Sequence, residues 1–429
     1  MLDLQFIKDN IEAVEKNIAN RFMNADARPV IALMEERASA ITALDALRRA
    51  RNENADKMKA KLSPEDRAVL IEEGKRIKDE ITAAEARVAE AETACFTAAR
   101  SIPNMTHPDA PVGREDKDSS EVARFGEPTV FDFKALDHVQ LGEKLDIIDF
   151  DAGTKVAGTK FYFLKNEAVF LEQALVRYAL DILVKRGFTP MITPDIAKEE
   201  ILEGIGFNPR GTESNIYPLE GTGTCLVGTA EITLGGYYQN DIIDLSTGPI
   251  RMAGLSHCFR REAGAAGQFS KGLYRVHQFT KLEMFIYCKP EESDAMHAEL
   301  RGIEEDIYKG LGIPFRVVDT ATGDLGAPAY RKWDLEAWMP GRGDAGEWGE
   351  ITSTSNCTDY QARRLGIRYR DEQGKPRFVH MLNGTAVACS RAMIAILENY
   401  QKADGSVAMP SALVPYLGFD RILPRKKGF

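Results

Sequence analysis

Arginines and acids gather in three segments of the second half of the chain, and side chains of these types can handle a nucleotide and its phosphates. The segments are residues 258–264 (CFRREAG) with their continuation through residues 274–283, residues 350–356 (EITSTSN) and residues 382–391. A guanidinium group binds phosphate through two parallel hydrogen bonds, and a neighbouring carboxylate suits a divalent cation. The chain has neither a GxxxxGK[ST] loop nor a GxGxxG fingerprint after an expected strand, so the commonest nucleotide-binding folds find no support.

Strand periodicity allows these side chains to meet in one site. Alternate residues of a strand share a face, so Arg260 falls on the same face as Glu262. Phe279 and Glu283 also share a face and would lie about 13 Å apart, the span from a nucleotide base to a small substrate beyond its phosphates. Taken singly, Phe279 is more often a core residue, Glu283 a half-buried ion-paired acid and Arg391 a surface charge. Together, as structural residues, they would place charged groups in several apolar elements with nothing to offset the cost of burying them. This favours a shared binding site.

Residues beyond about 125 are expected to form the α+β domain that carries this site. Strand-like runs and amphipathic helical runs occupy separate stretches, which favours an antiparallel sheet with flanking helices. The strand-like runs are residues 161–164, 249–259, 275–288 and 377–382, and the helical runs are residues 168–186, 291–310 and 386–400.

The first hundred residues are expected to be almost entirely helical. A short helix over residues 4–20 is followed by a break near Pro29 and then by two long helices separated at residues 63–66 (SPED). Ser63 is a natural N-cap and Pro64 a favoured first-turn residue. So short a connection makes the long helices antiparallel, and each would extend roughly 50 Å at 1.5 Å per residue. Such a hairpin is an arm, because it buries too little surface to form a core.

Apolar residues repeat along both helices of this hairpin. In the second helix they step by four and three without a slip, as in a coiled-coil seam: Leu70, Gly74, Ile77, Ile81, Ala84, Val88, Ala91 and Cys95. The first helix has a rougher series: Val30, Met34, Ile41, Leu44, Ala55, Met58 and Leu62.

The far half of the first long helix is basic, although the whole chain carries a net charge of −10. Basic residues outnumber acids between positions 37 and 61, and such a face suits a phosphate backbone better than a partner helix. The alternative is a dimerisation coiled coil or a solvated spacer. The candidate nucleic-acid contacts are Arg48, Arg49, Arg51, Lys57, Lys59 and Lys61.

Three regions are therefore expected: the helical arm over residues 1–101, a Pro-rich polar linker over 102–125, and a catalytic domain over 126–429. No apolar run approaches the roughly 20 residues of a membrane helix, and the N-terminus lacks the apolar stretch of a secretory signal, so we expect a cytoplasmic protein. The cysteines are scattered without a CxxC pair, which favours reduced, buried thiols over a metal site drawn from distant residues.

The order and spacing of these segments resemble the class II aminoacyl-tRNA synthetases, and specifically the bacterial-type seryl-tRNA synthetases. The similarity runs from MLDLQFIKDN through FDFKALDHVQLGE to NGTAVACSRAMIAILENYQKADG and so covers nearly the whole chain. Residues 187–194 (GFTPMITP) resemble motif 1, residues 259–262 with 275–279 resemble motif 2, and residues 384–391 resemble motif 3. The HIGH-type and KMSKS-type signatures of class I synthetases do not occur.

The resemblance implies a role for each matching residue. The catalytic residues would be Arg260, which holds the α-phosphate and the substrate carboxylate, Arg391 and Glu350. The ATP site would comprise Arg260, Arg261, Glu262, Phe279, Glu350, Ile351, Thr352, Ser353 and Arg391. The serine site would comprise Thr229, Ala230, Glu231, Arg260, Glu283, Asn383 and Thr385. Glu350 and Ser353 would also hold Mg²⁺.

The resemblance further implies a homodimeric ligase of protein biosynthesis, with motif 1 forming much of the dimer interface. It would activate L-serine with ATP to seryl-adenylate and transfer serine to the 3′ end of tRNA(Ser), and to tRNA(Sec) if the organism has one. The arm would grip the long variable arm of these tRNAs by shape. A catalytically silent tRNA-binding paralogue would lose motif arginines or acids, which this chain keeps, and a ligase that charges a carrier protein would lack the arm.

The chain departs from the family pattern at three places. Arg261 stands where many members have a small residue, and Gln268 and Phe269 stand where an Arg-Asp pair is common. Cys389 and Ser390 replace the usual small residues before the motif 3 arginine. The second departure bears on contacts with the tRNA acceptor end and leaves the expected adenylation site unaffected.

Overall fold

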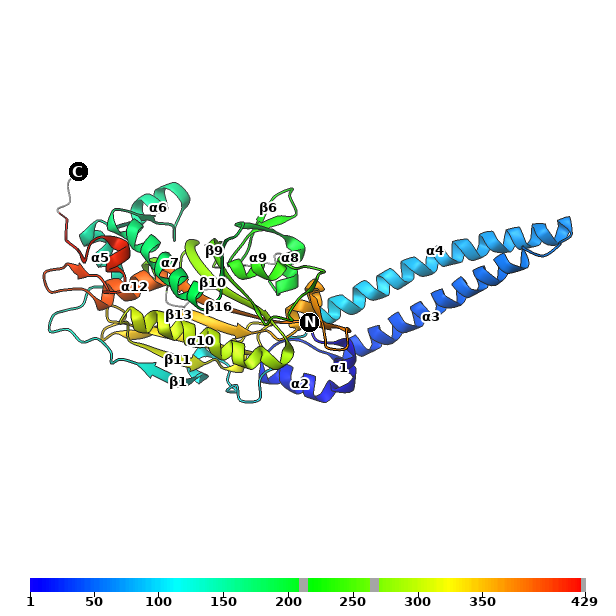
Figure 1. Ribbon diagram of the computed structural model, residues 1–429, viewed down its shortest axis with the longest axis horizontal. Coiled ribbons are helices and arrows are strands. Elements are labelled where there is room, and N and C mark those ends of the chain that lie inside the picture. The colour runs from blue at the N-terminus through cyan, green and yellow to red at the C-terminus, as the bar shows by residue number, and fades with distance from the viewer. Residues whose placement is uncertain (208–214, 263–269, 426–429) are drawn as a thin grey trace. The chain divides into compact units, whose positions relative to one another are not determined.

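The computed structural model describes residues 1–207, 215–262 and 270–425. The chain divides into two compact units, Met1–Met105 and Thr106–Phe429 (Figure 1). Within the described ranges, none of the helices combines the length and the apolarity that a membrane crossing requires. The departures at Gln268 and Phe269 lie outside the described residues.

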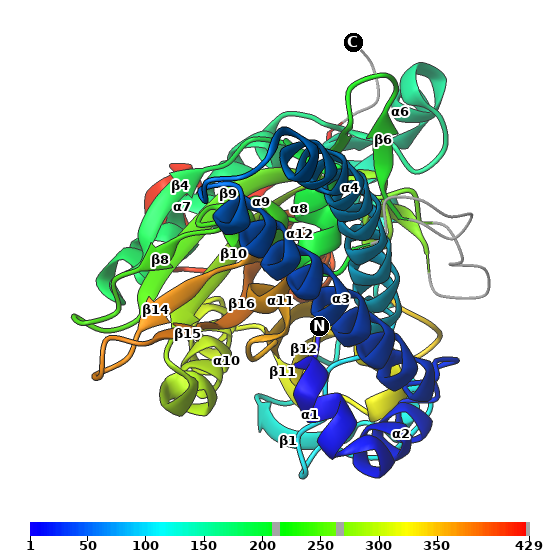
Figure 2. The same cartoon turned by 90° about the vertical axis from the view of Figure 1, so that its right-hand side faces the viewer.

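Helices build the first unit: α1 (Leu4–Asp9), α2 (Ile11–Asn20), α3 (Arg28–Lys57) and α4 (Pro64–Arg100). The expected helix over residues 4–20 is two helices, separated at Asn10. The start of α4 agrees with the prediction, because the Ser63 hydroxyl accepts a hydrogen bond from the Asp66 N–H at 3.0 Å and Pro64 is the first helical residue. α3 and α4 run antiparallel, side by side (Figures 1 and 2).

The α3–α4 interface follows the predicted seam along α4 but departs from it in α3. Ile77 and Ile81 of α4 pack with Leu44 of α3. The prediction for Ala55 is wrong: this residue is exposed, and Asn54 is buried instead. The predicted apolar series has no member between Leu44 and Ala55, so it did not show which residue of that turn faces α4. Helical steps of three, three and four from Leu44 reach position 54. The Asn54 amide donates to the Leu70 carbonyl at 3.2 Å, which satisfies it inside the seam.

Residues 102–125, the expected linker, contain two regular elements: η1 (Asp116–Asp118) and β1 (Ser120–Phe125). β1 pairs antiparallel with β11 (Phe315–Asp319) at the edge of the main sheet, so the end of the expected linker is in fact an edge strand. Its side chains are mostly exposed, and a half-solvated edge strand resembles a polar loop in sequence. The functional divisions at residues 101 and 126 remain predictions.

In the described part of the second unit, eight strands form one sheet in the order β1-β11-β12-β13-β16-β10-β9-β4. Neighbouring strands are antiparallel except for β4 and β9, which are parallel. The further strands of this sheet are β4 (Thr189–Ile192), β9 (Ile250–Phe259), β10 (Gln278–Cys288), β12 (Arg331–Met339), β13 (Glu347–Asn356) and β16 (His380–Ala388). Shorter sheets contain β2 (Ile148–Asp149), β3 (Phe163–Leu164), β5 (Ile196–Lys198), β6 (Tyr217–Leu219), β7 (Thr224–Leu226), β8 (Ile242–Ile243), β14 (Arg368–Arg370), β15 (Pro376–Phe378), β17 (Val407–Ala408) and β18 (Arg421–Ile422).

The strand that leads into motif 3 is longer than the sequence indicated. A strand was expected to end at residue 382 and a helix to begin at 386, whereas β16 continues to Ala388 and α12 begins at Cys389. Residues 385 and 387 pair with β10 and so remain in the sheet. β11, β12 and β13 were also not predicted, although the buried alternate residues Trp333, Leu335 and Ala337 carry the strand period.

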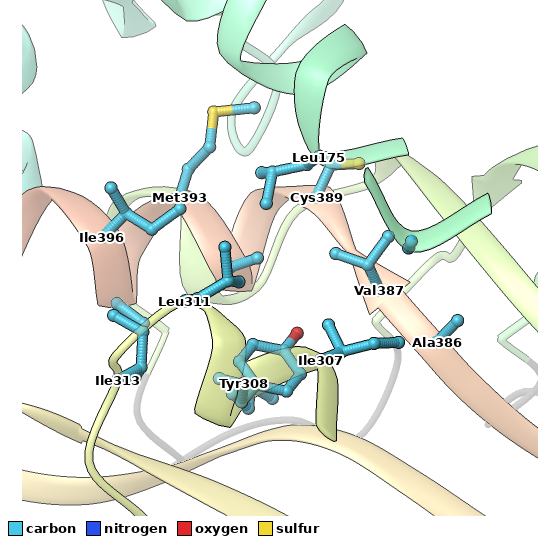
Figure 3. Close-up of a cluster of buried hydrophobic side chains, with 14 of the residues drawn as sticks. Leu175, Ile307, Tyr308, Leu311, Ile313, Ala386, Val387, Cys389, Met393 and Ile396 are labelled. Carbon is cyan, nitrogen blue, oxygen red and sulfur yellow. The ribbon is translucent and has the colours of Figure 1, made fainter. Parts of the chain in front are cut away.

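Helices cover the sheet and hold the strands that carry the site. They are α5 (His138–Leu145), α6 (Phe150–Ala157), α7 (Glu167–Lys185), α8 (Glu199–Ile205), α9 (Ala230–Gly236), α10 (Ser293–Gly310), α11 (Tyr360–Leu365), α12 (Cys389–Asn399) and α13 (Val414–Leu417), with short η2 (Gly272–Tyr274), η3 (Pro290–Glu292) and η4 (Thr322–Asp324). In the main core, Leu175 of α7, Tyr308 of α10 and Met393 of α12 gather near Val387 of β16 (Figure 3).

Candidate active site

One cavity in the second unit brings together the three polar segments of the sequence. The empty space between its side chains, together with the solvent at its mouth, is about 510 Å³. Strands β10, β13 and β16, the chain after β9 and the first turn of α12 enclose it. The lining residues are Arg260, Glu262, Tyr274, Arg275, Val276, Phe279, Lys281, Glu350, Ile351, Thr352, Ser353, Thr385, Ala388, Ser390 and Arg391.

Arg261 is an ATP-site candidate that the structure does not bring to this cavity. Its side chain is exposed, and its backbone N–H donates to the Asn215 carbonyl at 2.9 Å. Successive residues of an extended chain face opposite sides, so Arg260 and Glu262 turn toward the cavity while Arg261 does not. The extra cation of this chain therefore lies away from the cavity.

An aromatic platform and two arginines form one end of the cavity. The Arg260 guanidinium lies over the Phe279 ring, 5.3 Å from its centroid, and Nε of Arg260 donates to the Gly228 carbonyl at 3.1 Å. Arg275 forms an ion pair with the Glu262 carboxylate. Glu262 adopts a left-handed backbone conformation with φ of 51°, which is uncommon for this residue type and is often found at binding sites. This end presents a flat ring face and a buried carboxylate.

A second arginine, Arg391, lies at the β13 side of the cavity. Its NH1 group is 3.3 Å from Oε1 of Glu350 and donates to the Glu350 carbonyl at 3.0 Å. Its guanidinium also lies 4.7 Å from the centroid of the Tyr274 ring. Burial alone would raise the pKa of Glu350, but the surrounding cations, Arg391 foremost, outweigh it and hold the pKa below the usual value. Glu350 is therefore a carboxylate at neutral pH.

Glu350 and Ser353 were expected to hold Mg²⁺, and their chemistry fits such an ion. Both offer oxygen, the ligand type that Mg²⁺ prefers, and Mg²⁺ at phosphate sites usually takes few protein ligands. Both line the cavity, and the Glu350 side chain is 42% exposed and so is accessible to an ion. In the described ranges, no cluster of three or more His, Cys, Asp or Glu side chains could enclose a metal. The residues present thus suit an ion shared with nucleotide phosphates.

The serine-site candidates adjoin the cavity on the β10 side. Thr229 is the N-cap of α9, where its hydroxyl accepts a hydrogen bond from the Glu231 N–H at 3.2 Å, and Ala230 begins the helix. Glu283 of β10 is paired in register with Thr385 of β16. Gly254 of β9 lies on the other side of Glu283, and a methyl group there would press on Leu234, Thr193 and Ala230. These contacts bring the four segments together.

Glu231 is the most perturbed acid among these candidates. Its Oε1 atom accepts hydrogen bonds from Gln361 Nε2 at 2.9 Å and from Asn383 Nδ2 at 3.0 Å. Burial, reinforced by the nearby Glu283 charge, raises its pKa to about 7. Glu231 therefore titrates near neutral pH, and Asn383 reaches it from β16.

A buried hydrogen-bond chain that the sequence did not indicate supports the cavity wall. His138, the first residue of α5, accepts at Nε2 from the Leu273 N–H at 3.2 Å, and its Nδ1 lies 2.9 Å from Oε1 of Glu398. The Nε2 acceptor role places the proton on Nδ1, so His138 donates to Glu398 of α12. Leu273 precedes Tyr274, whose ring contacts Arg391. These hydrogen bonds thus link α12 to the segment that contacts Arg391. The partners are too distant in sequence for local patterns to have found them.

The six basic arm candidates are all exposed in the first unit. Arg48 pairs with Glu85 at 3.1 Å, and Lys59 pairs with Asp56 at 2.7 Å. The other four, Arg49, Arg51, Lys57 and Lys61, form no ion pair with the described residues. Four solvated cations near the hairpin end are available to an anionic partner.

Comparison with known proteins defines the class. Residues 221–400, which contain all the cavity-lining residues named above, match the family model described as tRNA synthetase class II core domain (G, H, P, S and T). Residues 1–106 match the seryl-tRNA synthetase N-terminal domain. The serine–tRNA ligase of Treponema denticola is 69% identical over 422 residues, which span 98% of this chain and 100% of that relative.

Solved structures agree along the full length. Seryl-tRNA synthetase from Pyrococcus horikoshii, complexed with ATP, has a TM-score of 0.89 at 38% identity and covers 99% of this chain and 100% of its own. The cytoplasmic serine–tRNA ligase from Naegleria fowleri, in complex with AMP, has a TM-score of 0.86 at 32% identity and covers 99% of both chains. The chain belongs to the seryl-tRNA synthetase family. It is a ligase that attaches serine to tRNA and uses ATP.

Proposed function

We propose that the cavity beside α12 is where this ligase joins serine to the α-phosphate of ATP. The observation that carries the proposal is that Arg260, Glu350 and Arg391, from three separate segments, line one cavity. In this proposal Phe279 supports the adenine ring and Glu262 binds its amino group. Arg260 holds the α-phosphate and the serine carboxylate, and Arg391 covers the other adenine face and reaches the γ-phosphate.

The reaction that these residues would support needs charge stabilisation more than proton transfer. A carboxylate oxygen of serine attacks the α-phosphorus, and the bond from that phosphorus to the pyrophosphate oxygen breaks. Serine is already ionised, so no general base is required, and the arginines stabilise the developing negative charge. Mg²⁺, bound through Glu350 and Ser353, would neutralise phosphate charge when present.

Specificity for serine would come from the polar groups around Thr229, Glu283 and Thr385. A hydroxyl-binding pocket rejects alanine, because the missing hydroxyl leaves buried polar groups unpaired. Threonine would be rejected by its extra methyl group, a weaker discrimination of about 10–200-fold.

Further partners follow from family membership and from two surface features. The four unpaired arm cations support binding of tRNA(Ser), and of tRNA(Sec) where one exists. Ile192, at the open edge of β4 within motif 1, is 86% exposed, which supports a homodimer through residues 187–194. We place the enzyme in the cytoplasm, where aminoacylation serves translation.

Serine-dependent exchange of pyrophosphate into ATP tests the proposal. Purified protein should exchange with serine, far less with threonine and not with alanine. Binding of tRNA(Ser) without serine-dependent exchange would overturn it in favour of the catalytically silent paralogue. Gel filtration or ultracentrifugation tests the dimer, and exchange with and without EDTA tests the requirement for Mg²⁺.

A further inference from the structure

Lys281 is a buried cation to which neither the sequence motifs nor the proposed reaction assign a role. It lies on β10 between Phe279 and Glu283, on the strand face that both share. Its side chain is 9% exposed and lines the cavity beside Arg260. Phe279 is the proposed adenine platform and Glu283 belongs to the proposed serine site. Lys281 therefore lies between the proposed adenine and serine positions on β10.

The contacts of Lys281 join it to the serine site. Its Nζ atom lies 2.5 Å from Oε2 of Glu283 and donates to the Thr229 hydroxyl at 3.1 Å. The Glu283 side chain is 2% exposed, so water cannot replace this partner. A buried carboxylate without a cation is strongly destabilising. Lys281 thus holds Glu283 in place and compensates its charge.

We infer that Lys281 is a positioning residue of the serine site, whose ammonium holds the Glu283 carboxylate and the Thr229 hydroxyl in the arrangement that receives serine. The inference rests on the proposed serine site. Thr229 lies at the start of α9 and Glu283 lies on β10, so Lys281 joins two separate elements of that site.

A second buried acid, Glu231 of α9, lies close to Glu283. The pKa of Glu231 is raised first by burial and further by the Glu283 charge, whereas Lys281 and Arg260 act on it in the opposite direction. Without Lys281, these two acids would have Arg260 as the remaining nearby cation, so Lys281 compensates negative charge that the fold places around the serine site.

The first test separates serine from ATP in pyrophosphate exchange. In Lys281→Met, the kcat/KM for serine should fall at least about 30-fold, the scale of a broken buried charge pair. The KM for ATP should change by less than about threefold, because Phe279 and Arg391 remain. Lys309→Met, which removes an exposed α10 cation paired with Glu305, is the matched control and should match wild type. A normal serine KM in Lys281→Met would overturn the inference.

Charge rescue gives a readout that lost packing alone would not change. Lys281→Arg keeps a cation that can pair with Glu283 and donate to the Thr229 hydroxyl, whereas Lys281→Met keeps a similar length without the charge. The kcat/KM for serine in Lys281→Arg should therefore lie within about threefold of wild type. A loss in Lys281→Arg as large as that in Lys281→Met would contradict a charge-based role.

Glu283 variants distinguish failure of this inference from failure of the proposed site. Glu283→Gln should raise the serine KM by itself, and a normal value would overturn the serine-site assignment. The double variant Lys281→Met/Glu283→Gln leaves neither charge unpaired and so guards against unfolding of the single variant. Its loss in kcat/KM for serine should be no greater than that of Glu283→Gln alone. Additive losses would show that Lys281 acts independently of Glu283 and would overturn the inference.

Discussion

The basic face of the α3–α4 arm and the cavity beside α12 both concentrate cations, but they hold them in opposite ways. The arm candidates are exposed, and four of the six form no ion pair with the described residues. In the cavity, three cations each have an acid beside them. Arg275 pairs with Glu262 and Lys281 with Glu283, two acids whose side chains are at most 7% exposed, and Arg391 pairs with the more accessible Glu350.

This difference separates two uses of positive charge. A solvated cation contributes affinity for a phosphate backbone through counterion release, and the effect depends on salt. A buried cation held by an acid costs desolvation free energy but has a fixed position, which suits stabilisation of a transition state. The arm should therefore tolerate substitution gradually, whereas single changes in the cavity should abolish chemistry.

The largest effect is expected from Arg260→Ala. Loss of one charged contact to the reacting phosphate should reduce pyrophosphate exchange by about 10²–10³-fold, roughly 2.7–4 kcal/mol. Binding of tRNA(Ser), measured by filter retention, should stay within about twofold, because the arm cations are unchanged. Near-normal exchange would contradict the assignment of Arg260.

Removal of the arm should have the opposite pattern of effects to Arg260→Ala: tRNA charging should be lost while serine activation is kept. NH2 of Arg37 and Oε1 of Glu92 lie 2.8 Å apart, so a short Gly-Ser loop can replace residues 37–91. Aminoacylation of tRNA(Ser) should fall at least about 100-fold, since several phosphate contacts are lost together. Serine-dependent exchange should remain near wild type. Equal loss of both activities would remove the distinction.

A comparison within the arm is expected to give a smaller effect. Replacing the unpaired Arg49, Arg51, Lys57 and Lys61 by Gln should raise the KM for tRNA about tenfold and flatten its salt dependence. The matched control replaces four paired cations by Gln: Arg48, Lys59, Lys75 and Arg76. Its effect should be smaller, because these charges are partly neutralised already. Equal effects would show that pairing on the arm does not matter.

The smallest expected effect concerns stability and comes from Glu231→Gln. The pKa of Glu231 is raised from 4.5 to about 7 in the folded protein, so only the unfolded chain ionises between these values. The free energy of unfolding of wild type therefore falls, through this group, as pH rises across that window. Gln keeps an oxygen acceptor for Gln361 and Asn383 but does not titrate.

Thermal unfolding at pH 5 and pH 8 measures this effect. The Tm of Glu231→Gln relative to wild type should be higher at pH 8 than at pH 5, by about 2–4 °C for each kcal/mol. The same Tm difference at both pH values would contradict the raised pKa.

Much of the arm could be predicted from the sequence, because its structure depends on contacts between neighbours in the chain. The seam of α4 and the Ser63 cap follow from helical periodicity and capping. The error at Ala55 arose where the apolar series of α3 had a gap, and the partner helix selected Asn54 instead.

The candidate site was predictable in part. Strand alternation correctly allowed Phe279 and Glu283 to share a face, and the same alternation would have included Lys281, which no motif marked. Alternation also placed Arg261 on the strand face opposite to Arg260, although the family resemblance had included Arg261 in the ATP site; the structure leaves it exposed. The Leu273–His138–Glu398 chain joins three distant segments and left no local signal.

The helical hairpin with its basic face, the antiparallel α+β character and, through the order of the motifs, the synthetase class could all be predicted from the amino-acid sequence. Periodicity, caps and charge runs involve residues that are close together in the chain, so they can be recognised from the sequence. Which charges are buried, and which partners they have, became known from the folded chain. Burial and ion pairing depend on strands brought together from across the chain, and they set the pKa of Glu231, the charge of Glu350 and the position of Lys281.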